Sequence, residues 1–208
     1  MSEKIIYTIG HSTQTIEQFI GLLKKHSVDC VVDVRSTPYS QYASQFNQPE
    51  IRQELKKAGI EYIHMGKEFG ARRDNKDLYD SSGKLDFDKT VGDEDFLSGI
   101  GRIKAGIEKG YTIAFMCTEK EPQDCHRCIL VGRSFNDMQG IKVENIKGDG
   151  TLISQDEIGI LLVDKYFPDR KQVSLFAADN KTEEAYIDEA YRLRGKEIAY
   201  QASEQELR

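Results

Sequence analysis

The chain has 208 residues, of which 38% are hydrophobic and 31% charged, and its formal net charge at neutral pH is −6. This length suits one sizeable domain with an appendage, and the acidic balance excludes bulk attraction to phosphate backbones as a binding mechanism. No apolar run is long enough to span a membrane, and the first residues lack a charged-then-apolar signal pattern. We therefore expect a cytoplasmic protein without membrane contacts.

Strand and helix patterns alternate along the first 150 residues. Short apolar segments predict strands at 4–9, 28–34, 60–65, 111–116 and 141–146. Apolar residues at helical spacing predict helices between them, at 15–26, at 49–59, from 96 to 107 and after residue 125. This alternation predicts a Rossmann-like α/β fold, a three-layer sandwich whose mainly parallel sheet of about five strands has helices on both faces.

Two other stretches complete the chain. Residues 66–92 are polar and lack a clean period, so we expect a long functional loop or lid with short helices at most. After a short extended piece at 151–153, Ser154 and Glu157 form a capping-box pattern before a helix that ends at Pro168. We expect an α/β core domain at 1–168 and a helical extension at 169–208. A helix that begins near Thr182 would pack on the core or join a second subunit in a homo-oligomer.

Reactive side chains follow the predicted strands at their carboxyl ends. His11 comes after the first strand, Asp33 and Arg35 end the second, and Cys117 and Glu119 follow the fourth. The carboxyl ends of parallel strands lie along one edge of a sheet, where open α/β folds bind ligands. We therefore expect these side chains to share one site.

The densest group of such residues lies in the strand-to-helix turn after Cys117, and one interpretation is an anion site. Arg127 can bind a phosphate or carboxylate through two parallel hydrogen bonds, and a helix N-terminus adds N–H donors. Arg35 and either Arg72 or Arg73 would also bind the anion, together with His11 and Ser12 at the first strand. Acid–base chemistry would then fall to carboxylates and histidines at the same edge.

Two further interpretations use the cysteines. Cys117 or Cys125 could act as a nucleophile, because a thiol beside His126, Arg127 and a helix N-terminus has a depressed pKa. Such a strand–Cys–loop–helix layout resembles the rhodanese arrangement, although the loop here is acidic. The third interpretation is zinc held by the three cysteines of this region, including Cys128, with help from His126. A second close cysteine pair is absent from the sequence, which leaves the zinc pattern incomplete.

Four separated motifs resemble a known family. They are TIGHS at 8–12, DVRSTPYS at 33–40, YIHMGKEFG at 62–70 and MCTEKEPQDCHR at 116–127, and they are similar to the domain of unknown function 488. In the last motif the matching positions are Cys117, Glu119, Pro122, Cys125, His126 and Arg127. The resemblance implies no established activity, and only a loose association of some members with DNA repair.

Together these patterns predict an enzyme, a hydrolase or group transferase, that acts on a phosphate-bearing substrate derived from a nucleotide or nucleic acid. The predicted catalytic residues are Asp33, Cys117, Glu119, Cys125 and His126. The predicted substrate-binding residues are His11, Ser12, Arg35, Arg72 and Arg127. We expect no cofactor and no bound metal. The alternative is a non-catalytic module that binds a ligand or nucleic acid at the same edge.

Overall fold

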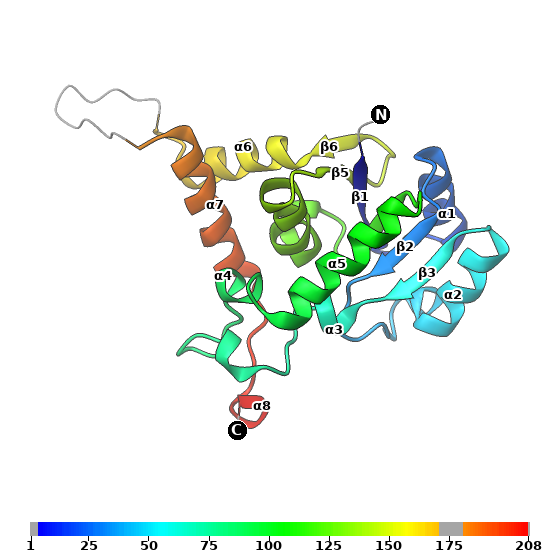
Figure 1. Ribbon diagram of the computed structural model, residues 1–208, viewed down its shortest axis with the longest axis horizontal. Helices are drawn as coiled ribbons and strands as arrows, with labels where there is room; N and C mark the ends of the chain where they lie inside the picture. The colour runs from blue at the N-terminus through cyan, green and yellow to red at the C-terminus, as the bar shows by residue number, and fades with distance from the viewer. Residues whose placement is uncertain (1–3, 171–180, 208) are drawn as a thin grey trace.

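The computed structural model of the protein describes residues 4–170 and 181–207 (Figure 1). Its sheet has the strand order β3-β2-β4-β1-β5-β6. The strands are β1 (Ile5–Gly10), β2 (Cys30–Asp33), β3 (Glu61–His64), β4 (Ile113–Cys117), β5 (Lys142–Ile146) and β6 (Leu152–Ser154). The first five are parallel to one another, which confirms the predicted α/β class and mainly parallel sheet. The short extended piece becomes a sixth strand, antiparallel to β5.

Helices occupy the connections between the strands. The α-helices are α1 (Ile16–Lys25), α2 (Gln48–Lys57), α3 (Gly66–Phe69), α4 (Phe87–Thr90), α5 (Glu94–Glu108), α6 (Gln155–Tyr166), α7 (Glu183–Ile198) and α8 (Glu204–Leu207). The short 3₁₀ turns are η1 (Ser44–Phe46), η2 (Lys76–Leu78) and η3 (Pro122–Asp124). The helix predicted after residue 125 has π-type hydrogen bonding in η4 (Arg127–Gly132) and η5 (Ser134–Met138). π-Bulges of this kind occur frequently at functional sites.

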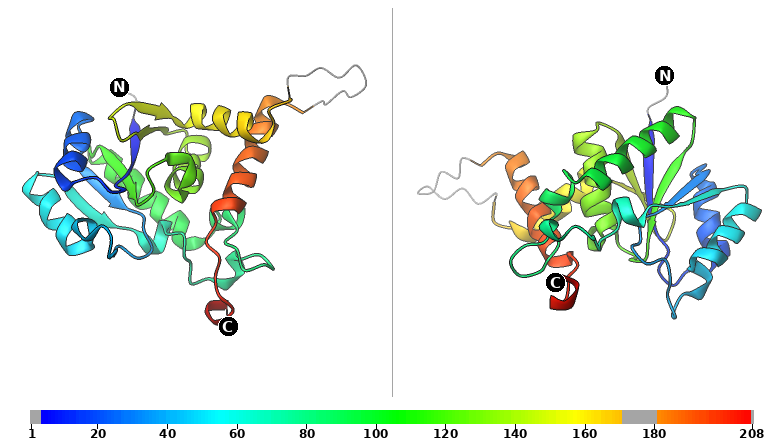
Figure 2. Two further views of the ribbon diagram at one scale, coloured as in Figure 1. Left: turned by 180° about the vertical axis from the view of Figure 1, so that it is seen from behind. Right: turned by 60° about the horizontal axis from the view of Figure 1, so that its bottom comes forward.

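The sheet separates two hydrophobic cores, and helices cover both of its faces (Figure 2). On one face, Phe19 of α1 and Leu55 of α2 pack against Val31 of β2. On the other, Phe96 of α5 and Phe135 of the π-helix pack against neighbouring strands. The sequence predicts both cores because the central strands are apolar on both faces, as parallel strands between helix layers must be.

Local capping explains where two helices begin. The Thr15 side chain accepts a hydrogen bond from the backbone N–H of Gln18, and the Gln18 side-chain oxygen accepts one from the backbone N–H of Thr15. Ser154 and Glu157 form the same reciprocal pair at the start of α6, as the sequence predicts. Each box satisfies two N–H groups that would otherwise lack partners, so these helix starts are specified locally.

Residues 66–92 form an ordered segment with short helices, anchored by one buried arginine. The Arg73 guanidinium donates to the backbone carbonyls of Lys67 and Glu68 and to the Asp93 carboxylate. Further along, Leu85 packs in a small apolar cluster with Ala202 from the C-terminal segment. Two distant parts of the chain are thereby joined at the lower end of the view in Figure 1.

The C-terminal helix α7 packs against α6 and the π-helix of the same chain (Figure 1). The Tyr191 hydroxyl donates to the backbone carbonyl of Gln155 and accepts from its side-chain amide. Helix α7 begins after Thr182, close to the predicted start, and the Thr182 side chain caps it. Positions 171–180 of the predicted extension lie outside the described residues. Within the described part of the chain, no helix has the length and apolar character needed to cross a membrane.

Candidate active site

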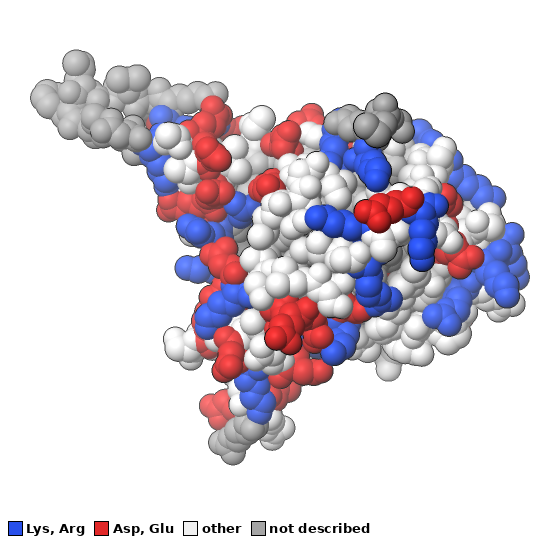
Figure 3. Space-filling view, in the orientation of Figure 1, with Lys and Arg blue, Asp and Glu red and all other residues white. Residues whose placement is uncertain are grey.

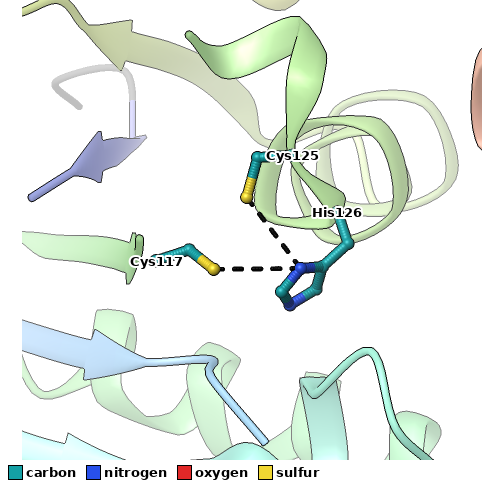
Figure 4. Close-up of side chains that lie close together, drawn as sticks. All are labelled: Cys117, Cys125 and His126. Carbon is teal, nitrogen blue, oxygen red and sulfur yellow. Dashed lines mark hydrogen bonds between the residues drawn. The ribbon is translucent and has the colours of Figure 1, made fainter. Parts of the chain in front are cut away.

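Three side chains meet between the end of β4 and the start of the π-helix. Figure 4 shows Cys117 at the tip of its strand, facing Cys125 and His126 across the turn. The Nδ1 atom of His126 lies 3.8 Å from the Cys117 Sγ atom and 3.9 Å from the Cys125 Sγ atom. All three residues are buried. We call this group the cysteine–histidine cluster.

Backbone geometry turns Cys125 toward Cys117. Residue 125 has an extended conformation (φ −133°, ψ 139°) at the end of η3, so it precedes the helix and does not follow the helical rotation. Its sulfur accepts a hydrogen bond from the backbone N–H of Arg127 at 3.4 Å. Cys128 points elsewhere, because its sulfur lies 3.5 Å from the side-chain oxygen of Gln155. Cys128 is therefore a core residue and stands apart from the cluster.

A backbone carbonyl orients His126. Its Nε2–H group donates to the Val34 carbonyl at 3.1 Å, immediately after β2. Since Nε2 is engaged there, Nδ1 is the atom that faces the two sulfurs. Burial disfavours the charged ring, but the hydrogen bond and negative charge of Cys125 outweigh it and raise the pKa of His126.

The two thiols differ in acidity because their surroundings differ. Burial opposes ionisation of Cys125, yet the hydrogen bond from Cys117 and the charges of Arg127 and His126 hold the pKa of Cys125 well below its ordinary value. The same hydrogen bond, together with burial, raises the pKa of Cys117 well above the ordinary range. Cys125 is therefore the more acidic thiol of the pair, and Cys117 donates a hydrogen bond to it.

A carboxyl group adjoins the cluster on the solvent side. Glu119 is an exposed residue, but its carboxyl group turns inward and accepts a hydrogen bond from the Cys125 thiol at 2.8 Å. Burial of that group and the negative charge of Cys125 raise the pKa of Glu119. An acid, a thiol and an imidazole therefore lie in direct contact.

Arg127 fixes the loop that carries Glu119. The arginine is fully buried, and its Nη1 and Nη2 groups donate to the backbone carbonyls of Glu119 at 2.7 Å and Lys120 at 3.3 Å. Its Nε atom finds no hydrogen-bond partner among the described residues. Both terminal amino groups of this arginine, which the sequence predicts to bind an anion, therefore donate to backbone carbonyls of the protein.

A second network lies beside the cluster at the end of β2. Arg35 donates to both carboxylate oxygens of Asp33, at 2.9 and 2.6 Å, and also to the Phe46 carbonyl. Its Nη1 group donates to Nε2 of His11 at 3.2 Å, while His11 Nδ1–H donates to the carbonyl of Ser12. Burial and the charge of Arg35 lower the pKa of His11 to about 4, so its ring is neutral at pH 7.

The residues of this network are buried and bind one another, which limits their capacity to bind a ligand. Asp33 is fully buried, and its second oxygen also accepts from the Tyr62 hydroxyl at 2.7 Å. Every nitrogen of the Arg35 guanidinium has a protein partner. Arg35 could bind an anion only by giving up one of these contacts. Tyr62 was missed as a partner, because in the sequence it is one apolar position of a strand.

Of the two remaining predicted residues, Ser12 lies beside the cluster and Arg72 does not. The backbone N–H of Ser12 donates to the Thr118 carbonyl, and Ser12 adopts a left-handed conformation (φ 46°). The structure directs the Arg72 guanidinium elsewhere, onto the Tyr200 ring at 4.6 Å. The edge therefore brings together His11, Ser12, Asp33, Arg35, Cys117, Glu119, Cys125, His126 and Arg127, and turns the Arg72 side chain to the C-terminal segment.

A surface cavity of about 450 Å³ borders the loop that carries Glu119. It lies between that loop, the start of α1 and the turn after β5, and we call it the edge cavity. Its lining residues are Ser12, Thr13, Gln14, Lys120, Glu121, Lys147, Gly148 and Asp149. The two lysines can attract an anion, while the two carboxylates limit the net charge of the cavity.

Comparison with known proteins identifies the family of the chain. The family model described as "Domain of unknown function DUF488" matches residues 15–133. The matched range contains the motifs at 33–40, 62–70 and 116–127, and hence the whole cysteine–histidine cluster. No curated protein and no solved structure matches the chain.

Proposed function

The chain belongs to the family of the domain of unknown function DUF488, and from its geometry we propose an enzyme that hydrolyses or transfers a group on a small phosphate-bearing substrate. The observation that carries the proposal is the contact among Cys125, His126 and Glu119. The His126 imidazole and the Glu119 carboxyl group lie within 3.9 Å of the Cys125 thiol sulfur, and the loop that carries Glu119 borders the edge cavity. Such groups supply nucleophilic and acid–base chemistry when they lie together.

The substrate class follows from the edge cavity. Lys120 and Lys147 line it together with Ser12, whose hydroxyl group can donate to a phosphate oxygen. A nucleotide or a nucleotide-derived phosphate fits this size and chemistry better than a long nucleic acid. The face in Figure 3 shows basic and acidic side chains interspersed, whereas a phosphate backbone requires a continuous basic surface.

Every predicted site residue except Arg72, whose guanidinium lies on the Tyr200 ring, keeps a role in this proposal. Cys117, Cys125, His126 and Glu119 form the reaction centre. Asp33, Arg35 and His11 hold the adjoining strand ends in place, and Arg127 fixes the backbone that presents Glu119. Ser12 and the two cavity lysines contact the substrate.

A ligand screen followed by an activity assay tests the proposal. Nucleotides and sugar phosphates are added to the purified protein, and a ligand bound at about 100 times its dissociation constant should stabilise the fold by about 2.7 kcal/mol. The double variant Lys120→Gln/Lys147→Gln should lose that stabilisation. The matched control Lys56→Gln/Lys57→Gln, on exposed positions of α2, should keep it.

Turnover of the ligand then separates an enzyme from a binding module. Wild-type protein should release a product that Cys125→Ala protein does not release, while both proteins still bind the ligand. Binding without turnover in the wild type would favour the non-catalytic module. The absence of any stabilising ligand in the phosphate series would contradict the substrate class.

A further inference from the structure

The cysteine–histidine cluster has the arrangement of a metal site as well as that of a reaction centre. One ligand atom from each of Cys117, Cys125 and His126 lies within 4.8 Å of the other two. For tetrahedral zinc, bonds of about 2.3 Å to sulfur and about 2.0–2.1 Å to nitrogen place those ligands roughly 3.6 Å apart. The observed sulfur–nitrogen separations are 3.8 and 3.9 Å, so an ion fits with a small inward movement.

The surroundings of the three ligands match those of bound zinc. Metal-ligating histidines usually donate their second ring N–H to a carbonyl or carboxylate, and His126 donates Nε2–H to the Val34 carbonyl at 3.1 Å. The backbone N–H of Arg127 donates to the Cys125 sulfur, which stabilises a thiolate ligand. These two contacts hold the histidine and one cysteine in place before any ion arrives.

From this geometry we propose that Cys117, Cys125 and His126 bind one zinc ion, with Glu119 beside the fourth position. Two thiolates and one imidazole form a ligand set that suits zinc, and three protein ligands leave one position for water or substrate. The Glu119 carboxylate contacts Cys125 at 2.8 Å, where it can occupy that position or yield it.

The catalytic role of the ion rests on the proposed function and deepens it, because it names the metal at the same site. With zinc bound, both sulfurs are metal ligands, and the nucleophile becomes the water at the fourth position. Zinc lowers the pKa of bound water and so supplies hydroxide near neutral pH. Binding of the ion itself is independent of any substrate and is tested without one.

Zinc content and cobalt spectra test the proposal directly. The protein is purified under reducing conditions, freed of loose metal, and assayed for zinc per chain. We expect one equivalent in the wild type and in the control Cys128→Ala, whose sulfur lies on Gln155. Cys117→Ser and Cys125→Ser should retain less than a tenth of an equivalent.

Cobalt titration into the metal-free protein identifies the ligands. Wild-type protein should show a thiolate-to-cobalt charge-transfer band and tetrahedral d–d bands, which both cysteine variants should lose. Glu119→Gln should keep the charge-transfer band and bind about 10- to 100-fold more weakly. Wild-type protein without these bands, or equal losses in Cys128→Ala and Cys117→Ser, would overturn the proposal.

Thiol labelling of the wild type keeps the test valid if a variant fails to fold. In native protein, added zinc should protect Cys117 and Cys125 from alkylation, as mapped by peptide mass, and leave the labelling of Cys30 and Cys128 unchanged. Equal labelling of all four thiols with and without zinc would contradict the site. A protein that binds zinc but turns over no phosphate substrate would refute the proposed function alone.

Discussion

A side chain on Gly10 would place its Cβ atom 1.8 Å from the backbone carbonyl oxygen of Glu119. The same Cβ atom would lie 3.1 Å from Nη1 of Arg127, which donates to that carbonyl. The end of β1 and the loop after β4 therefore approach each other as closely as backbone allows. Only glycine fits here, and the contact fixes the backbone of Glu119 against the end of β1.

The first prediction follows from this contact. Gly10→Ala should destabilise the protein by more than about 2 kcal/mol, because the added methyl group must push the Glu119 loop outward. Urea unfolding measures the free energy difference. Gly21→Ala, at an exposed position of α1 with open space around its Cβ atom, should instead add about 0.5–1 kcal/mol. Equal effects of the two variants would show that the loop is not fixed by Gly10.

The second prediction concerns the buried ion pair at the end of β2. Asp33→Asn should cost about 3–5 kcal/mol, since it leaves Arg35 charged and buried without its carboxylate. The exposed pair between Glu54 and Lys57 on α2 provides the control, and Glu54→Gln should change stability by less than about 1 kcal/mol. A mild loss in Asp33→Asn protein would mean that Arg35 is not held as the structure shows.

The third prediction addresses the docking of α7. Tyr191→Phe should lower the free energy of unfolding by about 1–3 kcal/mol, because the buried amide of Gln155 loses its hydroxyl partner. Tyr42→Phe serves as the control, since that ring is 98% exposed, and it should stay within about 0.5 kcal/mol of the wild type. If Tyr191→Phe protein were as stable as the wild type, α7 would not unfold cooperatively with the rest of the fold.

Sequence patterns were sufficient for the backbone of the site. Buried apolar segments and their helical connections placed Asp33 and Cys117 at the carboxyl edge, because strand order along a parallel sheet does not change which end a residue occupies. Ser154 is recognisable as a cap because the capping box is a local hydrogen-bond pattern. These features depend on neighbours within a few positions along the chain.

The sequence does not predict which side chains contact each other across the fold. The contact of Arg72 with Tyr200 joins residues 128 positions apart, and nothing near Arg72 indicates it. The separation of Cys128 from Cys125 depends on the extended conformation of residue 125, whereas a regular helix would place the two on similar faces. The cysteines that the sequence offers to zinc include Cys128, which the structure places on Gln155 and apart from Cys117, Cys125 and His126.

The fourth prediction concerns removal of the metal. Metal-free wild-type protein should be less stable than the zinc-loaded form, by about 2.7 kcal/mol when free zinc is 100 times its dissociation constant. Because Cys117→Ser protein lacks one ligand, buffered zinc should leave its unfolding curve unchanged. If zinc stabilised the wild type and the Cys117→Ser variant equally, the ion would bind at a site other than the cysteine–histidine cluster.

Zinc X-ray absorption on the wild-type protein tests the central claim most directly. Two sulfur ligands at about 2.3 Å and lighter nitrogen or oxygen ligands at about 2.0–2.2 Å are expected from Cys117, Cys125, His126 and the fourth position. A coordination shell with three or more sulfurs, or with none, would contradict the cysteine–histidine cluster as the metal centre of this protein.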